Sequence, residues 1–250
     1  MSHINAAIPP RLTANAPEVG VSLPRMMNTM THEMFFKEHF NDIKQTEQYI
    51  LDQIKNILEP INSHRDTNIA EHTTSRIKTP GSTIEKLLLA GYEPTEENAL
   101  NILSDVIGVR LVVHFLGDIY TIRNLLVNSG KMVIIKEKDY VRNAKPSGYR
   151  GYHIIIETNV NGFKTRVEIQ LRTIAMDCWA SLEHQMRYKK VVKNTELIDS
   201  ELKKCADDLM SSDIAMEQIF ELIKRSTEEE SDDDKFFEDA IKCLHEGGVL

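Results

Sequence analysis

The stretch from Phe163 to Arg172 alternates between two kinds of residue without a break, and this pattern restricts the fold more than any other feature of the chain. Its odd positions are Phe, Thr, Val, Ile and Leu, and its even positions are Lys, Arg, Glu, Gln and Arg. Successive side chains of a strand point to opposite faces of a sheet, so one face is core and the other polar. Asn161-Gly162 favours a type I′ turn, because both central positions of that turn need positive φ. We predict an antiparallel hairpin with His153–Asn159.

Two more strands are expected, Val106–Phe115 and Met132–Val141, with a helix around Asp118–Asn128 between them. Helical spacing of apolar residues predicts one long helix over Phe35–Leu58, which Pro60 stops. Strands grouped together between helical segments indicate an α+β domain, with a mixed β-sheet of about five strands flanked by helices.

The remaining helices are read from caps and spacing. Ser82–Ala90 is expected to be a helix with Ser82 as N-cap, Glu85 as its capping-box partner and Gly91 as its end. Further helices are expected from Thr173 to about Lys190, over Asn194–Arg225, and over Phe236–Leu244 after the acidic run Glu228–Asp234.

The domain organisation follows from these elements. Residues 1–30 contain four prolines and no helical period, so we expect a flexible leader. Residues 31–190 form the main domain, including its N-terminal helix, and residues 191–250 form a C-terminal helical extension. The apolar positions of that extension suit either an oligomer interface or packing on their own domain.

Composition excludes several classes of protein. No apolar run approaches the ~18–20 residues of a membrane span, and the start lacks a secretory signal, so a cytoplasmic location is expected. Cys178, Cys205 and Cys243 are widely spaced and support neither a disulfide framework nor a zinc site. The net charge of −8 does not favour RNA as a partner. Between Arg65 and Lys190, however, 18 Lys and Arg face 14 Asp and Glu, which suits a polyphosphate ligand.

The residues that suit phosphate chemistry lie in three segments. The loop from Asn143 to His153 combines glycines with Lys145, Arg150 and tyrosines, which allow close approach to phosphate and stacking of a base. Arg76, Lys78 and Lys86 lie before and within the helix at 82–90. Asp105 opens a strand and, paired with another carboxylate, is a candidate ligand of Mg²⁺. The charged face of the strand at 163–172 is also consistent with simple solvation.

Four motifs in order resemble the synthetase domain of the alarmone synthetase family, which makes guanosine tetra- and pentaphosphate. They are Arg-x-Lys at 76–78, Asp-x-x-Gly-x-Arg at 105–110, Lys-x-x-Gly-Tyr-Arg at 145–150 with His153, and Glu-Ile-Gln-Leu-Arg-Thr at 168–173. The segment 175–184 is similar to the small, stand-alone branch. The resemblance implies a nucleotidyltransferase-like synthetase domain.

The resemblance also implies a role for each matching residue. On the ATP side, Arg76 and Arg110 would flank the adenine. Lys78 and Lys86 would hold the phosphates, and Asp105 and Glu168 would bind Mg²⁺. On the acceptor side, guanine stacks on Tyr149, its phosphates lie near Lys145 and His153, and the pocket is supported by Gln170 and Arg172. Glu168 is the candidate to assist loss of the 3′-hydroxyl proton.

The implied activity is transfer of the β,γ-pyrophosphate of ATP to the 3′-hydroxyl of GDP or GTP, in the stringent response and without hydrolase activity. A homo-oligomer, plausibly a tetramer, is also implied. Gly151 stands where many members of the family have Ser, which would loosen the loop after Tyr149. Asp177 stands where some have Asn, at a position associated with binding an alarmone activator, so activation by an alarmone is not assumed. Two alternatives stay open: a toxin-like enzyme acting on tRNA 3′ ends or adenine nucleotides, and a catalytically silent RNA-binding module.

Overall fold

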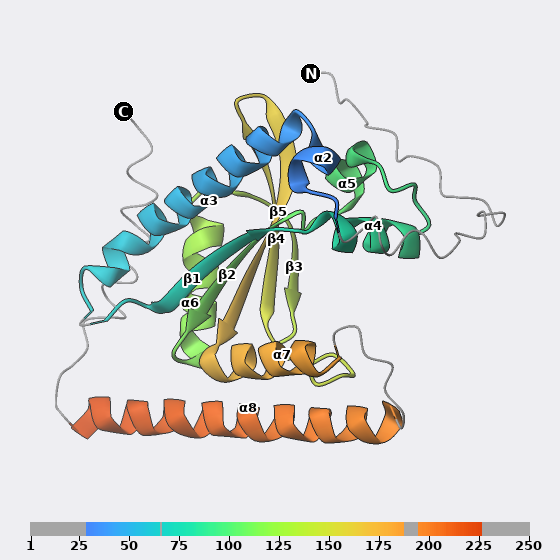
Figure 1. Ribbon diagram of the computed structural model, residues 1–250. Coiled ribbons are helices and arrows are strands. Elements are labelled where there is room, and N and C mark those ends of the chain that lie inside the picture. The colour runs from blue at the N-terminus through green and yellow to red at the C-terminus, as the bar shows by residue number, and fades with distance from the viewer. Residues whose placement is uncertain (1–28, 66, 188–194, 227–250) are drawn as a thin grey trace.

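The computed structural model describes residues 29–65, 67–187 and 195–226, which form one mixed sheet with helices around it (Figure 1). The helices are α2 (His32–Phe36), α3 (His39–Asn62), α4 (Pro80–Leu89), α5 (Glu96–Ile102), α6 (Leu116–Asn128), α7 (Ile174–Arg187) and α8 (Thr195–Ser226). The strands are β1 (Ala70–Ile77), β2 (Ile107–Val113), β3 (Val133–Asp139), β4 (Tyr152–Val160) and β5 (Phe163–Thr173).

The sheet has the order β1-β2-β5-β4-β3, in which β2 and β5 are parallel and the other neighbours are antiparallel. The predicted α+β class with a mixed five-stranded sheet is therefore confirmed. The hairpin between β4 and β5 is also confirmed, because Asn161 and Gly162 have φ of +52° and +90° and Val160 pairs with Phe163.

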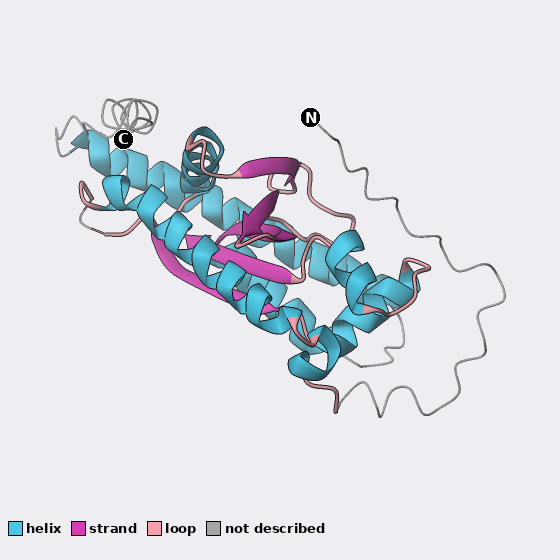
Figure 2. Ribbon diagram, turned by 90° about the horizontal axis from the view of Figure 1, so that it is seen from above, coloured by secondary structure: helices cyan, strands magenta, loops and turns pink. Residues whose placement is uncertain are grey.

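One face of the sheet carries the main core. α3 and α6 pack together against it, and the long helix α3 runs obliquely across the strands (Figures 1 and 2). Val167, Ile169 and Leu171 of β5 are fully buried there, as are Ile50 of α3 and Ile122 of α6. The alternation in β5 thus has its expected consequence: Glu168, Gln170 and Arg172 lie on the opposite face of the sheet.

Strand β1 had no predicted counterpart, although the expected number of strands was right. β1 is an edge strand, and most of its side chains are exposed. Its sequence, AEHTTSRI, therefore has no alternation of apolar and polar residues by which a strand could be recognised. Arg76, which was expected just before a helix, is therefore on a strand, opposite Gly108 of β2.

Three predicted helix boundaries are wrong. The helix expected over Phe35–Leu58 is broken at Lys37, where φ is +47°, and it continues through Pro60 to Asn62, since proline in a last turn removes only one hydrogen bond. Ser82 does not cap α4. The Thr79 side chain accepts from the Ser82 amide and Pro80 is the first helical residue, so Glu85 has no capping role.

Helix α8, the last one in the described residues, packs along α7 and reaches the start of α6 (Figure 1). Trp179 of α7 and Leu202 of α8 are buried in a small second core, and the Trp179 indole donates to the Leu202 carbonyl at 2.8 Å. At the far end of α8, Phe220 stacks on Phe115 with ring centroids 4.3 Å apart. Other apolar positions of α8 remain exposed, namely Leu197, Ile214, Ile219 and Ile223.

Several predictions fall outside the described residues: the leader up to residue 28, Cys243, and the acidic run and short helix between 228 and 244. In the described part, Cys178 and Cys205 are free and exposed. None of the helices that the structure describes has both the length and the apolar character needed to cross a bilayer.

Candidate active site

The predicted site residues gather on the polar face of the sheet, opposite α3 and α6. Strand register brings them together: Gly108 of β2 pairs with Glu168 of β5, and Arg110 pairs with Gln170. On the other side of β5, His153 of β4 also pairs with Gln170. Residues from three motifs therefore share one surface, and Arg76 of the first motif joins them because it pairs with Gly108.

Two lysines meet at Asp105, just before β2. The Lys78 ammonium lies 3.0 Å and the Lys86 ammonium 2.7 Å from the same oxygen, Asp105 Oδ2. Burial disfavours the charged carboxylate, but these two lysines outweigh it and lower the pKa of Asp105 below its usual value. Asp105 is thus an ionised carboxylate at the edge of a cationic group.

Glu168 lies at the centre of a second network. It is 9% exposed, and its two oxygens contact His153 Nδ1 at 3.1 Å and Gln170 Nε2 at 2.7 Å. Burial raises the pKa of this carboxyl group, but hydrogen bonds with His153 and Gln170 outweigh burial and lower it to about 2. Glu168 is therefore fully ionised at neutral pH and, as a free carboxylate, a weak base.

Tyr149 is fixed by the same network through its hydroxyl. That hydroxyl lies 2.6 Å from His153 Nε2 and accepts from Arg172 Nη2 at 3.0 Å. Gly148 allows the loop to turn at this point with φ of +91°, while its amide donates to the Lys145 carbonyl at 2.8 Å. The Lys145 ammonium lies over the Tyr149 ring.

The two carboxylates fit a divalent metal that also binds substrate phosphates. Among the residues that the structure describes, Asp105 Oδ1 is buried and has no hydrogen-bond partner, which leaves one oxygen available for a cation. Within the described ranges no three His, Cys, Asp or Glu side chains gather to hold a metal alone. A divalent metal such as Mg²⁺ prefers one or two carboxylates plus phosphate oxygens, and Asp105 and Glu168 are the carboxylates of the site that could hold one.

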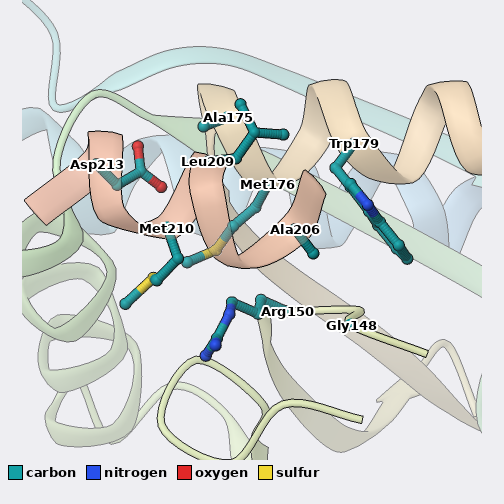
Figure 3. A pocket seen from close by; sticks show the side chains of 9 residues that line it. All are labelled: Gly148, Arg150, Ala175, Met176, Trp179, Ala206, Leu209, Met210 and Asp213. Carbon is teal, nitrogen blue, oxygen red and sulfur yellow. The ribbon is translucent and has the colours of Figure 1, made fainter. Parts of the chain in front are cut away.

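Arg150, which was considered a phosphate-binding cation, is held elsewhere. Its guanidinium donates to the Val141 carbonyl at 2.9 Å and to Asp207 of α8 at 3.2 Å. It borders a small, mostly apolar pocket between the loop, α7 and α8, opposite Met176 and Trp179 (Figure 3). Arg150 therefore ties its loop to α8.

Three polar residues beside the site were not predicted. Lys138 of β3 pairs in register with His153, and Tyr140 lies edge-on to Tyr149 with ring centroids 6.2 Å apart. Asp177 of α7 accepts from Arg172 at 2.9 Å and from Arg110 at 3.0 Å. The sequence signal for the first two was Lys-Asp-Tyr at the end of a predicted strand, and Asp177 was noted only as a departure from some relatives.

Comparisons with known proteins agree with this architecture. The family model for the region found in RelA / SpoT proteins matches residues 75–193. The GTP pyrophosphokinase YwaC of Bacillus subtilis is 37% identical over 189 residues, which cover 74% of this chain and 87% of that protein.

Two solved structures share the fold. A GTP pyrophosphokinase family protein from Streptococcus pneumoniae has a TM-score of 0.68 at 28% identity, covering 79% of this chain and 97% of that chain. The small alarmone synthetase 1 of Bacillus subtilis bound to its product pppGpp has a TM-score of 0.65 at 24% identity, covering 75% and 97%. The chain belongs to the small alarmone synthetases of the RelA/SpoT family. Pyrophosphokinases of this family generally use a divalent metal.

Proposed function

We propose that the chain transfers the β,γ-pyrophosphate of ATP to the 3′-hydroxyl of GDP or GTP, giving guanosine tetra- or pentaphosphate and AMP. The observation that carries the proposal is the polar face of the sheet, where two ionised carboxylates, Asp105 and Glu168, lie among cations and one tyrosine ring. A transfer between two polyphosphates needs that combination of charge and stacking. The chain would thus synthesise the alarmone in the stringent response and would not hydrolyse it.

The donor side consists of Arg76, Arg110, Lys78 and Lys86. The two arginines offer planar groups that stack on adenine. Lys78 and Lys86 share one carboxylate oxygen, so both ammonium groups are already gathered where the phosphates would lie. As AMP leaves, these charges stabilise the negative charge that develops on the oxygen between the α- and β-phosphorus.

The acceptor side is built around Tyr149. Guanine stacks on its ring, while Lys145 and His153 face the acceptor's phosphates and Gln170 and Arg172 hold the surrounding side chains in place. The 3′-oxygen forms a bond to the β-phosphorus, the bond from that phosphorus to the α-phosphate oxygen breaks, and the hydroxyl proton is lost. Glu168 is the candidate to receive this proton.

Asp105 and Glu168 would hold Mg²⁺, which would supply positive charge that offsets the charge of the substrate phosphates. Because the Glu168 pKa is already low, its main task is to hold charge and geometry, and proton acceptance is secondary. This division is consistent with phosphoryl-type transfer, in which positioning and electrostatics contribute most.

The larger organisation is also proposed. Residues 31–190 would be the catalytic domain, and residues 191–250 an extension in which the exposed apolar positions of α8 suit a homotetramer. The cytoplasm is the expected location. The charge distribution gives no support for RNA as a partner.

The test is product analysis with labelled ATP, Mg²⁺ and, in turn, GDP, GTP, GMP and uncharged tRNA. A guanosine polyphosphate that disappears with Glu168→Gln would support the proposal and rank the acceptors. Label on tRNA alone would favour the toxin-like alternative, and no transfer to any acceptor would favour a silent module.

A further inference from the structure

Asp177, on the first turn of α7, connects two arginines from neighbouring parallel strands. Its Oδ1 atom lies 2.9 Å from Nη1 of Arg172 on β5 and 3.0 Å from Nη1 of Arg110 on β2. The side chains are sheltered, with exposed fractions of 19% for Asp177 and 8% for Arg172. A charge-assisted hydrogen bond is strongest in such a partly desolvated position.

The two arginines need this carboxylate because they otherwise repel each other. Burial is the main cause that lowers the pKa of Arg110, and the charge of Arg172 lowers it further, whereas Asp177 raises it. The Nε atoms of both Arg110 and Arg172 are buried and have no hydrogen-bond partner in the described part of the chain. Asp177 therefore provides a large part of the compensation for two guanidinium groups.

Arg172, which Asp177 holds in place, contacts residues of the acceptor side. Its Nη2 atom donates to the Tyr149 hydroxyl and to Gln170 Oε1, each at 3.0 Å. Gln170 in turn donates to Glu168 Oε2 at 2.7 Å. A continuous series of contacts thus runs from Arg110, through Asp177 and Arg172, to the central carboxylate.

We propose that Asp177 is a positioning residue that holds the arginine of the ATP side and the arginine of the acceptor side in one geometry. The inference rests on the proposed function and adds that the two substrate sites are organised by one carboxylate within the same chain. Asp177 touches neither substrate; it acts through Arg110 and Arg172.

The test compares kcat and both KM values of the wild type, Asp177→Ala and Asp177→Asn. Losing the shared charged partner should raise KM for ATP and for the guanine nucleotide together, by roughly tenfold each in the alanine variant. Asparagine keeps one acceptor oxygen but no charge, so its values should be intermediate. Asp208→Ala, which removes an exposed carboxylate on α8, is the matched control and should match the wild type.

A purely structural role would lower the folded fraction, and hence apparent kcat, while leaving both KM values unchanged; that result would overturn the proposal. A rise in only one KM would also overturn it, because Asp177 would then serve a single site. Affinities for GDP and a non-hydrolysable ATP analogue, measured by calorimetry, test the role of Asp177 separately from the proposed transfer reaction. If the wild type bound both nucleotides but transferred nothing, the proposed function would fail, while the affinities of the variants would still decide the role of Asp177.

Discussion

The Nζ atom of Lys145 lies 4.7 Å from the centroid of the Tyr149 ring, so a cation covers the ring on which the proposed function places guanine. Nζ is also 4.8 Å from the ring of Tyr140, and burial lowers the pKa of this lysine. A cation between two aromatic rings is attracted to both faces. If guanine stacks on the Tyr149 ring as proposed, Lys145 has to leave that ring when the acceptor binds.

The first prediction concerns the Tyr149 ring. Tyr149→Ala removes the stacking surface and should raise KM for the guanine nucleotide by roughly 10- to 100-fold, the range of base–aromatic stacking. KM for ATP should change much less. Tyr149→Phe keeps the ring but loses the hydroxyl that contacts His153 and Arg172. Its KM for the guanine nucleotide should therefore lie between those of the wild type and Tyr149→Ala. Steady-state kinetics with each substrate varied in turn measures both; equal effects on the two KM values would contradict the assignment of this ring to guanine.

The second prediction concerns the metal. Asp105→Asn removes one of two carboxylates and should lower kcat by about a hundredfold or more, since metal charge stabilisation is worth several kcal/mol. The concentration of Mg²⁺ at half-maximal rate should rise, and EDTA should abolish transfer by the wild type.

A suitable control for Asp105→Asn is Glu157→Gln, which neutralises a carboxylate on the same sheet that is paired with Lys164 at 3.0 Å. It should leave the Mg²⁺ dependence unchanged. If Asp105→Asn kept the rate and the Mg²⁺ dependence of the wild type, Asp105 would not be a metal ligand.

Strands with a buried face could be predicted from the sequence, and strands without one could not. β5 was recognisable because its alternation records a core on one side only. β1 was not, since an exposed edge strand has no apolar pattern to reveal it. The cap of α4 was misplaced by three residues because Thr79 and Ser82 are both good caps, and only the position of Pro80 as first helical residue distinguishes them.

In the site, the residues brought together by strand register were predictable once the motifs were recognised. Asp177 was not, because its role depends on how α7 leaves β5 and turns onto the polar face. Arg150 was misjudged for a related reason. Its neighbours in sequence suggested phosphate, but its partner Asp207 comes from α8, 57 residues away in the chain.

The third prediction tests whether α8 supports the acceptor loop. A Cβ atom at Gly148 would lie 2.9 Å from the Ala206 Cβ and 3.0 Å from the Lys203 Cα, at a φ of +91°. Gly148→Ala should therefore lower the free energy of unfolding by roughly 2–4 kcal/mol, from backbone strain and overpacking together. KM for the guanine nucleotide should rise, because Tyr149 is the next residue.

Gly130→Ala separates these two causes. It also has positive φ, at +66°, but a Cβ there would meet nothing within 4 Å, so only the strain of about 1 kcal/mol should remain. Adding Ala206→Gly should make Gly148→Ala less costly than it is alone, which urea unfolding of the four proteins in this double-mutant cycle would measure. If the effects of Gly148→Ala and Ala206→Gly on the free energy of unfolding were strictly additive, the two residues would not interact, and α8 would not support the loop.

The fourth prediction concerns the pH dependence of stability through Glu137 of β3. Its oxygens accept from Arg123 Nε at 2.7 Å and Nη2 at 2.6 Å, and from the Tyr152 hydroxyl at 2.8 Å, which joins α6, β3 and β4. The hydrogen bonds from Arg123 lower the pKa of this carboxyl group in spite of partial burial. A lowered pKa in the folded state means stability that is present above the pKa of the unfolded chain, about 4.3, and lost as the pH falls through the folded value.

Glu137→Gln should therefore lower the free energy of unfolding by about 1 kcal/mol at pH 7, because this bidentate pair is only about one-quarter exposed. The difference from the wild type should stay constant down to about pH 5 and shrink below about pH 4, where the carboxyl group of the wild type takes up a proton. Urea midpoints at pH 7, 5, 4 and 3 measure this, with Glu71→Gln as a control, since the Glu71 side chain is 51% exposed and pairs with His114 rather than with an arginine. If the stability difference between wild type and Glu137→Gln grew as the pH fell, its sign would be wrong for a carboxylate that Arg123 keeps ionised. The Glu137–Arg123 pair would then not contribute to the loss of stability in acid.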